Sequence, residues 1–325
     1  MRKTTYLCLL FILILANPFI TKAQFQINYG VEEEIEALKQ STLYVIIDQD
    51  DHQNNPEYAK ILKENWTFSK VEVIESSEFP EYLKAGSYFL TLTTRYPQGF
   101  NLEKSPAALI HFYYSLWTPY KEYLAKIKKK NPKKIDFSEL ANTIATIDLE
   151  FDKSESFKAE DVMSGEFFGN GLPLYTGLGI FKNFIQAFQT KLETKVKNVY
   201  KFVELRNAEE LKELKTNTLY VPSTFLTDNS GSSFLSYTKN KRPLLDSKEI
   251  FEDYKYKYQV VSLKELNEMI LSDELIYYIS KPDQVTVNIT NSKTGELVYH
   301  SWVKENEKTS KKDLKELVKY FKEKK

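Results

Sequence analysis

Hydrophobic and polar residues follow one another along this chain with two periods, one of about two residues and one of about 3.6. The short period predicts strands and the long period predicts helices. In the first half, expected strands cover 42–48, 71–74, 87–94 and 107–117, and expected helices cover 56–65 and 79–84. Strands that alternate with helices of about ten residues predict an α/β fold with mostly parallel sheets.

The second half repeats this order of elements. Its expected strands cover 218–221, 258–262 and 275–279, its expected helices cover 247–254 and 263–271, and a hairpin joins 285–290 to 296–303. The hairpin turn contains Gly295, which suits the positive φ of such turns. A terminal helix has Leu314, Leu317, Val318 and Phe321 on one face. We therefore expect two related lobes, each a mixed, mostly parallel sheet flanked by helices and closed by a β-hairpin and a helix.

The two halves also share residues. Residues 34–45 align without gaps on residues 210–221, and seven of these twelve positions are identical. The identical pairs are Glu34 and Glu210, Leu38 and Leu214, Lys39 and Lys215, Thr42 and Thr218, Leu43 and Leu219, Tyr44 and Tyr220, and Val45 and Val221. This internal repeat predicts an N-terminal lobe at 24–205, with a helical insertion at about 119–158, and a C-terminal lobe at 206–325.

The first 23 residues have the pattern of a secretory signal peptide. Arg2 and Lys3 precede an apolar run that is too short to cross a bilayer, and Thr21 and Ala23 supply the small residues of a cleavage site. We expect cleavage after Ala23 and a periplasmic or secreted mature chain without a transmembrane segment. The alternative is that the segment stays uncleaved as a membrane anchor.

The composition narrows the classes of function. With 42% hydrophobic and 14% aromatic residues, the chain is too apolar to be disordered. The 45 basic and 45 acidic side chains balance, which argues against a nucleic-acid partner. The only cysteine, Cys8, lies in the expected signal peptide, so the mature chain is expected to lack disulfides, thiolate nucleophiles and cysteine-bound zinc.

An acidic cluster, Asp48-Gln-Asp50-Asp51-His52, is the sharpest candidate for chemistry. It follows the first expected strand at its carboxyl end, where open α/β sheets bind ligands. An apolar strand followed by Asp-x-Asp resembles the haloacid-dehalogenase-type phosphatases, and this resemblance implies Asp48 as nucleophile, Asp50 as acid and Mg²⁺ between them. His52 departs from that family, which usually has Thr or Val there, and the later Gly-Asp-x-x-x-Asp motif is missing.

Three interpretations of the acidic cluster stay open. The favoured one is a solvated turn that caps the next helix, with no cofactor. The second is a Mg²⁺ or Ca²⁺ site formed by Asp48, Asp50 and Asp51, although the spacing does not fit an EF-hand loop. The third is a metal-assisted hydrolase that uses the same three residues.

Half of the ten glycines lie between 165 and 179, among apolar and aromatic residues. This segment could be a partner-binding surface formed by Phe167, Phe168, Leu172 and Tyr175, because exposed apolar patches often mark interfaces. The favoured interpretation is instead a buried turn into a helix that begins near Leu178.

Several weaker motifs are expected to be structural. His111 and His300 lie in apolar strand patterns, where packed or hydrogen-bonded histidines are usual. The lysine-rich stretch 126–134 is expected to be a solvated helix face. Asn65 and Asn288 begin glycosylation sequons, which we attribute to chance in a chain with a bacterial type of signal.

The second half resembles a family of uncharacterised exported bacterial proteins. The resemblance rests on Thr218-Leu-Tyr-Val221, Tyr256-Lys-Tyr258-Gln-Val-Val-Ser262 and Asn291-Ser-Lys-Thr-Gly-Glu-Leu-Val298. The Lys-Thr-Gly-Glu hairpin is also similar to envelope domains of the curli-secretion and TolB N-terminal type. These likenesses imply an envelope binding module and identify no functional residues.

We therefore expect an exported, non-enzymatic binding or scaffold protein whose partner is an envelope protein or a cell-surface component. The groove between its halves is one candidate binding surface. The alternative function is the metal-assisted hydrolase.

Overall fold

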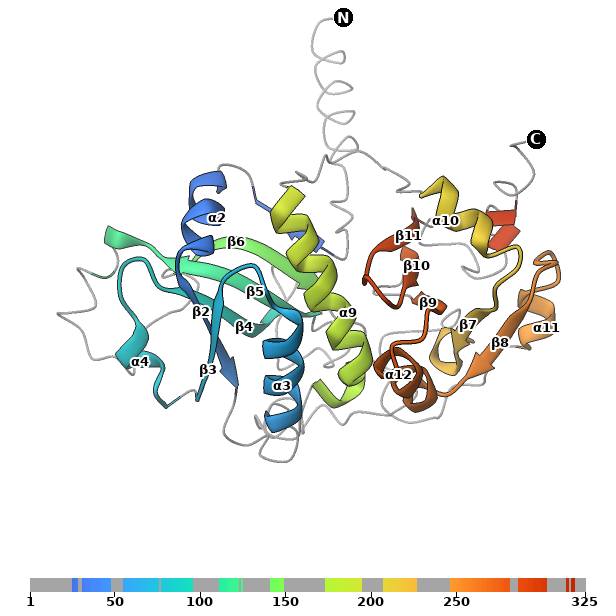
Figure 1. Ribbon diagram of the computed structural model, residues 1–325, viewed down its shortest axis with the longest axis horizontal. Helices are drawn as coiled ribbons and strands as arrows, with labels where there is room; N and C mark the ends of the chain where they lie inside the picture. Colours follow the sequence, from blue (N-terminus) through green and yellow to red (C-terminus); the bar gives the residue numbers. More distant parts are fainter. Residues whose placement is uncertain are drawn as a thin grey trace, which may run out of the picture.

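A computed structural model gives the fold of the chain. It describes residues 25–28, 31–47, 55–75, 77–95, 111–122, 124, 141–148, 173–194, 207–226, 246–280, 286–302, 314–315 and 317–318. These residues form two sheets with helices on both faces of each (Figure 1). The expected α/β fold in two lobes with mixed sheets is confirmed. The expectation that the sheets are mostly parallel is wrong, because antiparallel strand pairs are at least as many as parallel pairs in each sheet.

Lobe 1 contains a six-stranded sheet in the order β1-β6-β5-β4-β2-β3. Its strands are β1 (Phe25–Ile27), β2 (Thr42–Ile47), β3 (Lys70–Glu75), β4 (Tyr88–Arg95), β5 (His111–Pro119) and β6 (Ala141–Asp148). Its helices are α2 (Glu32–Lys39), α3 (Asn55–Asn65), α4 (Phe79–Tyr82) and α9 (Pro173–Thr194). Strand β2 is parallel to β3 and β4, and the other pairs are antiparallel.

Lobe 2 contains a five-stranded sheet in the order β11-β10-β9-β7-β8. Its strands are β7 (Leu219–Pro222), β8 (Tyr258–Val261), β9 (Tyr277–Ser280), β10 (Thr286–Asn291) and β11 (Leu297–Trp302). Its helices are α10 (Ala208–Glu213), the 3₁₀ turn η3 (Ser223–Leu226), α11 (Ser247–Ile250) and α12 (Leu263–Leu271), followed by helical residues at 314–315 and 317–318. Strand β7 is parallel to β8 and β9, and the other pairs are antiparallel.

The internal repeat extends to the order and register of the strands. If β1 is set aside, the two sheet orders are the same, with β2 to β6 corresponding to β7 to β11. Leu43 of β2 pairs with Tyr88 of β4, and the aligned Leu219 of β7 pairs with Tyr277 of β9. The sequence match therefore marks a repeated structural unit.

An irregularity in strand pairing is repeated as well. In lobe 1 the register between β5 and β6 shifts between Leu116 and Trp117. In lobe 2 the register between β10 and β11 shifts between Ile289 and Thr290, which the strand pairing makes equivalent to those two residues. A β-bulge at the same place in both sheets is a feature that unrelated sheets would not be expected to share.

The residues that match between the lobes have structural roles. Leu38, Leu43, Leu214 and Leu219 are each fully buried in a hydrophobic core. These leucines pack α2 against β2 in lobe 1 and α10 against β7 in lobe 2. Their conservation within the chain is explained by packing, and it does not indicate a shared ligand site.

The matching glutamates have the same role in both lobes. The side-chain amide of Asn142 donates to a carboxylate oxygen of Glu34 at 3.4 Å, and that of Asn291 donates to Glu210 at 2.8 Å. Each bond ties the first helix of a lobe to its antiparallel strands. The glutamates are half-buried, so they act as links between elements.

The layers of the two lobes lie in one line along the long axis of the molecule (Figure 1). Helix α4 covers the outer face of sheet 1, and α2, α3 and α9 cover the face toward lobe 2. Helix α12 covers the face of sheet 2 toward lobe 1, and α10, α11 and the side chains of Leu314, Leu317 and Val318 cover the far face. Each lobe is therefore a sheet between two helical layers.

Two expected elements differ from the structure in detail. Strand β6 lies within the segment expected to be an insertion, yet it pairs with both β1 and β5 and corresponds to β11. The helix expected at 247–254 ends at Ile250, after which Phe251 and Tyr254 enter the core through a turn. No helix among the described residues is long and apolar enough to cross a membrane.

Candidate functional site

Buried polar residues gather where α9 of lobe 1 meets lobe 2. We call this contact the seam: α9 on one side, and α12 with the β10–β11 turn on the other. Lys182, Asn183, Asn267 and Ser292 are all buried within it. Because buried polar groups need hydrogen-bond partners, their contacts show what the seam can do chemically.

The apolar part of the seam joins the two lobes in one core. Phe181, Ile185 and Phe188 of α9 belong to the same cluster of buried side chains as Leu266 and Ile270 of α12. Helix α12 presents this face because its N-terminus is fixed by a capping box, in which Ser262 and Glu265 bond reciprocally. Along α9 and α12, the expected groove between the halves is therefore replaced by a packed core.

Glycines allow α9 and α12 to approach closely. A Cβ atom on Gly179 would lie 2.6 Å from the backbone oxygen of Asn267, a distance that real Cβ atoms do not adopt. Gly177 kinks α9 with φ 68° and contacts the Asn267 side chain. Gly177 is therefore half-buried at the kink and Gly179 is buried within α9. Residues 165–172 of the glycine-rich segment lie outside the described residues, so the interpretation of that segment as a buried turn stays a prediction.

Asn267 satisfies the backbone at this kink. Its side-chain oxygen accepts from the N–H of Ile180 at 2.9 Å, and its side-chain nitrogen donates to the carbonyl of Leu263 at 2.8 Å. Because the kink deprives Ile180 of a regular helical partner, Asn267 supplies the missing acceptor. One side chain of lobe 2 thus completes a helix of lobe 1.

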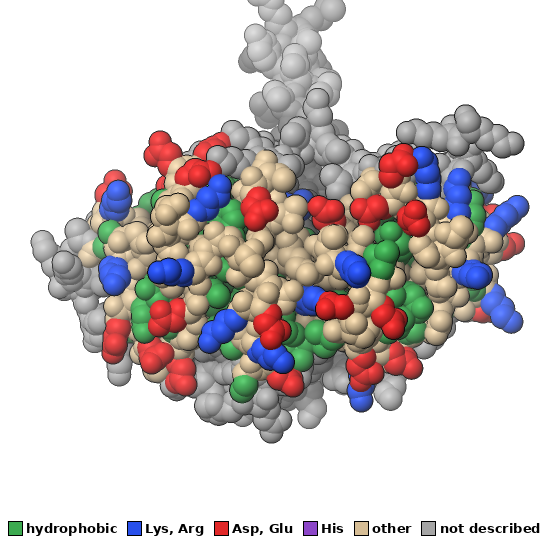
Figure 2. Space-filling view, in the orientation of Figure 1, with side chains coloured by type: hydrophobic (Ala, Val, Ile, Leu, Met, Phe, Trp, Pro, Cys, Tyr) green, Lys and Arg blue, Asp and Glu red, His purple; other side chains and the backbone are tan. Residues whose placement is uncertain are grey.

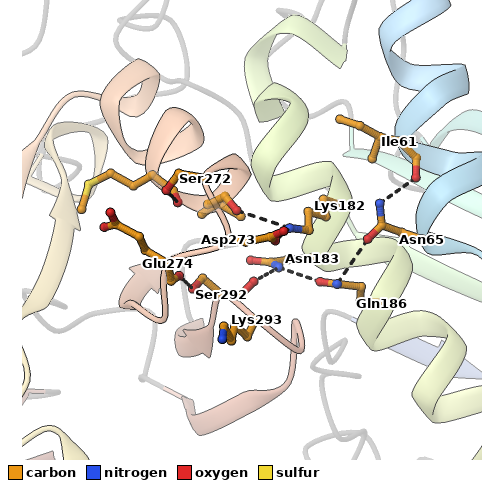
Figure 3. Close-up of polar contacts among 12 residues, drawn as sticks. Ile61, Asn65, Lys182, Asn183, Gln186, Ser272, Asp273, Glu274, Ser292 and Lys293 are labelled. Carbon is orange, nitrogen blue, oxygen red and sulfur yellow. Dashed lines mark hydrogen bonds and ion pairs between the residues drawn. The ribbon is translucent and has the colours of Figure 1, made fainter.

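Asn183 is the centre of the polar contacts (Figure 3). Its side-chain nitrogen donates to the carbonyl of Ser292 at 2.6 Å and to the side-chain oxygen of Gln186 at 2.9 Å. Its side-chain oxygen accepts from the hydroxyl of Tyr278 at 3.1 Å. Gly295, with φ 70°, packs on the Asn183 carbonyl, where any Cβ would overlap it. Both the strand and the turn of lobe 2 are fixed to α9 through this residue.

Lys182 is a buried cation with an exposed counter-ion. Its ammonium group forms an ion pair with Asp273 and donates to the carbonyl of Ile270 at 3.4 Å. The Lys182 side chain is 9% exposed, whereas that of Asp273 is 76% exposed. The hydrogen bond and charge of Lys182 lower the pKa of the Asp273 carboxyl. Asp273 adopts φ 60°, which is uncommon for a residue other than glycine and places its carboxylate beside α9.

Helix α9 is also fixed to lobe 1 by polar contacts. The side-chain oxygen of Gln189 accepts from the backbone N–H of Thr67 at 2.6 Å and of Phe68 at 3.2 Å, and its nitrogen donates to the Thr67 hydroxyl at 2.8 Å. Gln186 donates to the side-chain oxygen of Asn65 at 3.3 Å. The polar contacts therefore run from α3 through α9 to lobe 2.

Both glycosylation sequons are engaged in these contacts or buried. The side-chain nitrogen of Asn65 donates to the carbonyl of Ile61 at 2.9 Å. Asn288 is completely buried in β10. The folded chain therefore holds the Asn65 side chain in hydrogen bonds and buries Asn288. That the sequons occur by chance stays a prediction.

His300 is a hydrogen-bonded strand residue, as expected. Its Nδ1 lies 2.7 Å from the side-chain oxygen of Asn288. Because an amide oxygen can only accept, Nδ1 carries the proton and donates. His111 is the first residue of β5, but its side chain lies outside the described residues.

The residues expected to be functional lie at or beyond the limits of the described chain. Asp48, Asp50 and Asp51 follow Ile47, the last residue of β2, and lie outside the described residues. Within the described part, no group of three or more His, Cys, Asp or Glu side chains could hold a metal ion. That statement does not extend to the acidic cluster.

The expected partner-binding residues have a similar status. Phe167, Phe168 and Leu172 lie outside the described residues. Tyr175 belongs to α9, but its side chain is not among those described. The proposal that these residues bind a partner stays a prediction.

The seam residues were not expected from the sequence, although one signal was present. Lys182 and Asn183 interrupt an apolar run between Phe181 and Phe184 in a helix with otherwise apolar character. Two adjacent polar residues in a buried helix indicate polar partners in another element. The partners themselves lie about 90 to 110 positions further along the chain.

The arrangement is suited to holding two lobes together. The Lys182 ammonium faces a carboxylate and a carbonyl, and Asn183 uses its side chain for three hydrogen bonds.

No protein-family model matches the chain, and no match was found among curated proteins or solved structures.

Proposed function

We propose that this chain is an exported, non-enzymatic binding or scaffold protein that acts in the periplasm or outside the cell. Its partner would be an envelope protein or a cell-surface component. The observation that carries the proposal is the seam: α9 and α12 join the lobes through one core, with glycines at the closest approach. A protein whose lobes close on a small ligand needs a hinge and an open cleft between them.

The polar contacts of the seam support the same conclusion. Asn183 and Lys182 of α9 form polar contacts with lobe 2, and Asn267 of lobe 2 accepts a hydrogen bond from α9. Opening the lobes would leave several buried groups without partners, at about 1–3 kcal/mol for each group. A fixed pair of lobes is suited to presenting outer surfaces to a partner.

The test of this proposal begins with the mature protein in its native envelope. A tagged full-length chain is crosslinked in cells and purified, and its N-terminus is sequenced. We expect the mature chain to begin at Gln24, to be recovered outside the cytoplasm, and to carry a defined envelope component in a fixed ratio. A matched chain without residues 1–23 should stay inside the cell and lose that component. Recovery of the full-length chain in the cytoplasm, with no component attached, would contradict the proposal.

A metal-assisted hydrolase is the second candidate, and one observation favours it. Strand β2 lies between its parallel neighbours β3 and β4. The helices α3 and α4 of the two crossovers lie on opposite faces of the sheet. The carboxyl end of β2 is therefore a topological switch point, where α/β sheets bind ligands. Asp48, Asp50 and Asp51 follow that end directly.

Metal titration separates the two candidates. Melting of the wild type and of Asp48→Asn is followed with Mg²⁺ or Ca²⁺, together with turnover of a generic phosphate ester. The hydrolase predicts a metal-dependent rise in melting temperature and turnover that the variant loses. The binding protein predicts neither. The substitution Thr224→Asn at the aligned position of lobe 2 serves as the control, because that position has no acidic cluster.

A further inference from the structure

The two lobes differ at one end of their sheets. In lobe 1, strand β6 is covered by β1, which pairs with it in antiparallel orientation. In lobe 2, the corresponding strand β11 is the outermost of the described strands. An extended segment can dock on the edge of a sheet, because its backbone groups pair with those of the outer strand. The edge of β11 is therefore a candidate docking surface for an extended segment.

Charge does not identify what docks on the molecule. The described acidic and basic side chains are interspersed over both lobes on the face shown in Figure 2. Pairing along a strand edge is made by backbone hydrogen bonds and needs no charged partner. The backbone contacts that the two lobes share are therefore the better guide to the segment that occupies this edge.

One backbone hydrogen bond marks the same point on both edges. In lobe 1 the N–H of Asn28 donates to the carbonyl of Ile144 at 2.8 Å. In lobe 2 the N–H of Asn207 donates to the carbonyl of Val298 at 3.0 Å. Ile144 and Val298 are the extra residues of the two β-bulges, because the strand pairing passes over each of them. Asn28 and Asn207 therefore meet the outer strand at equivalent positions.

The residues before Asn28 show what the edge holds in lobe 1. They form β1, in which Phe25 pairs with Ile147, Gln26 with Thr146 and Ile27 with Ala145. The residues before Asn207 belong to the connection between α9 and α10. This connection, residues 195–206, lies outside the described residues. It contains no glycine or proline, so each of its residues can supply a backbone N–H to a strand pair.

We propose that residues 203–206 of the same chain dock on the edge of β11 as an antiparallel strand. This contact continues the hydrogen bond from Asn207 to Val298 in the direction that β1 takes in lobe 1. Because the chain is already held at Asn207, the segment has a higher effective concentration at the edge than a separate molecule has. The register of lobe 1 then pairs Arg206 with Tyr299, Leu205 with His300, and Glu204 with Ser301.

One position of this register differs in character between the lobes. Ile27 is buried beside Ala145 in the core of lobe 1, whereas its counterpart in lobe 2 is Arg206. The place of Ala145 is taken in lobe 2 by Tyr299, which is buried and fills the core itself. An apolar side chain is therefore not required beside it, and the stem of Arg206 can pack there while its guanidinium reaches solvent.

A docked segment affects how the molecule binds a partner. It closes the edge of β11 to strands of other molecules, so a partner must bind at another surface. It also holds the connection between the lobes against lobe 2, in addition to the contacts of the seam. The inference does not depend on which envelope component the protein binds.

Engineered disulfides in the mature chain test the proposal, since the only native cysteine lies in the expected signal peptide. Directly opposed residues of antiparallel strands have Cα atoms about 4.5–5.5 Å apart, which a disulfide can span. Glu204→Cys with Ser301→Cys should therefore close within one chain on oxidation. Phe25→Cys with Ile147→Cys is the matched pair in lobe 1. Leu205→Cys with Ser301→Cys places the cysteines on opposite faces and should stay reduced.

The mass of the oxidised protein distinguishes the possible occupants. A cross-linked monomer is the expected product, whereas a cross-linked dimer would assign the edge to a second copy and overturn the proposal. So would the absence of any cross-link in the lobe 2 pair when the lobe 1 pair closes.

Hydrogen exchange of the unsubstituted mature chain provides a test that needs no variant. The backbone amide of His300 faces the proposed strand, as that of Thr146 faces β1, so both should exchange slowly. Exchange of the His300 amide at the rate of a solvent-exposed amide, with Thr146 protected, would overturn the proposal.

Discussion

The two lobes have the same sheet order apart from β1, but they have different helices on the α4 and α12 side. Helix α12 has nine residues and a capping box at Ser262, whereas α4 has four residues and no side-chain cap. Helix α12 packs against α9, while α4 lies at the end of the molecule (Figure 1). Both lobes therefore share the strand order and the β-bulge. Of the two helices, α12, which packs against the other lobe, is longer than α4.

This difference shows which features of the repeat depend on the lobe and which depend on its neighbour. Strand register is fixed within each lobe, because a shift by one residue would turn every core side chain outward. The length and capping of the helices can differ between the lobes, because one helix packs against another lobe and the other does not. The residues that follow the central strand also differ between the lobes, since Asp48 of the acidic cluster aligns with Thr224 of lobe 2.

The largest expected effect comes from the matched leucines of the repeat. Leu38→Ala and Leu214→Ala each remove a fully buried side chain, so each should lower the free energy of unfolding by about 2–5 kcal/mol. Because the seam joins the lobes in one core, each variant should shift a single unfolding transition, as measured by calorimetry.

Leu271→Ala is the control for this pair, because Leu271 is 39% exposed and should change stability little. If a variant of either buried leucine unfolds in two separate steps, the lobes unfold as independent domains, and the seam does not join them in one cooperative unit.

Gly295 and Gly86 offer a sharper test of the seam. Both have positive φ, at 70° and 81°, but only Gly295 lies against a neighbouring backbone. Gly86→Ala should cost about 1–2 kcal/mol from the backbone conformation alone. Gly295→Ala should cost about 1–3 kcal/mol more, because its Cβ overlaps Asn183. Equal losses in urea unfolding would mean that the approach of lobe 2 to α9 is not tight.

Asn183 tests the polar part of the seam. Asn183→Ala leaves the Tyr278 hydroxyl and the Ser292 carbonyl without this partner, which should cost about 2–3 kcal/mol. Asn217→Ala is a milder control, since Asn217 donates a side-chain bond to Glu213 within lobe 2.

A double-mutant cycle with Tyr278→Phe measures the coupling between Asn183 and Tyr278. The two losses should not add, because both substitutions remove the same hydrogen bond. Strict additivity in denaturant unfolding would show that the bond contributes nothing.

The smallest expected effect concerns Asp273. Lys182 lowers the pKa of Asp273 in the folded state, so the ion pair stabilises the fold above the ordinary carboxyl pKa of about 3.9. The contribution disappears as the pH falls through the lowered pKa, where the carboxyl is protonated in both states. Because the Asp273 side chain is 76% exposed, the contribution should stay below about 1 kcal/mol.

Thermal melting of the wild type and Asp273→Asn between about pH 2 and pH 7 checks this sign. The difference between the two should be constant near neutral pH and vanish in acid. A difference that grows as the pH falls would contradict the assigned ion pair.

The sequence predicted the strands, the repeat and the hairpin because these depend on residues close together in the chain. The alternation of Val287 to Thr290 and the turn at Gly295 are local signals of this kind. Strand β6 lies in the segment expected to be a helical insertion, because the residue identities between the halves are confined to 34–45 and 210–221 and do not mark 141–148 as part of the repeat. Its pairing with β5 could not be inferred from its own residues.

The seam could not be predicted from local patterns. The bond from Asn183 to Ser292 joins residues 109 positions apart, and that from Ile180 to Asn267 joins residues 87 apart. Nothing in an apolar helix indicates which of its faces meets another lobe. The roles of Asp48, Phe167 and their neighbours stay predictions.

The distance between the two lobes in solution tests the central claim, that the seam fixes them as one body. Glu36→Cys and Lys212→Cys place one spin label on each lobe at aligned, exposed positions, and the only native cysteine lies in the expected signal peptide. Pulsed electron resonance should give one narrow distance distribution that added metal ions leave unchanged. Two populations, or one broad distribution, would mean that the lobes move apart and that the space between them can open to a ligand.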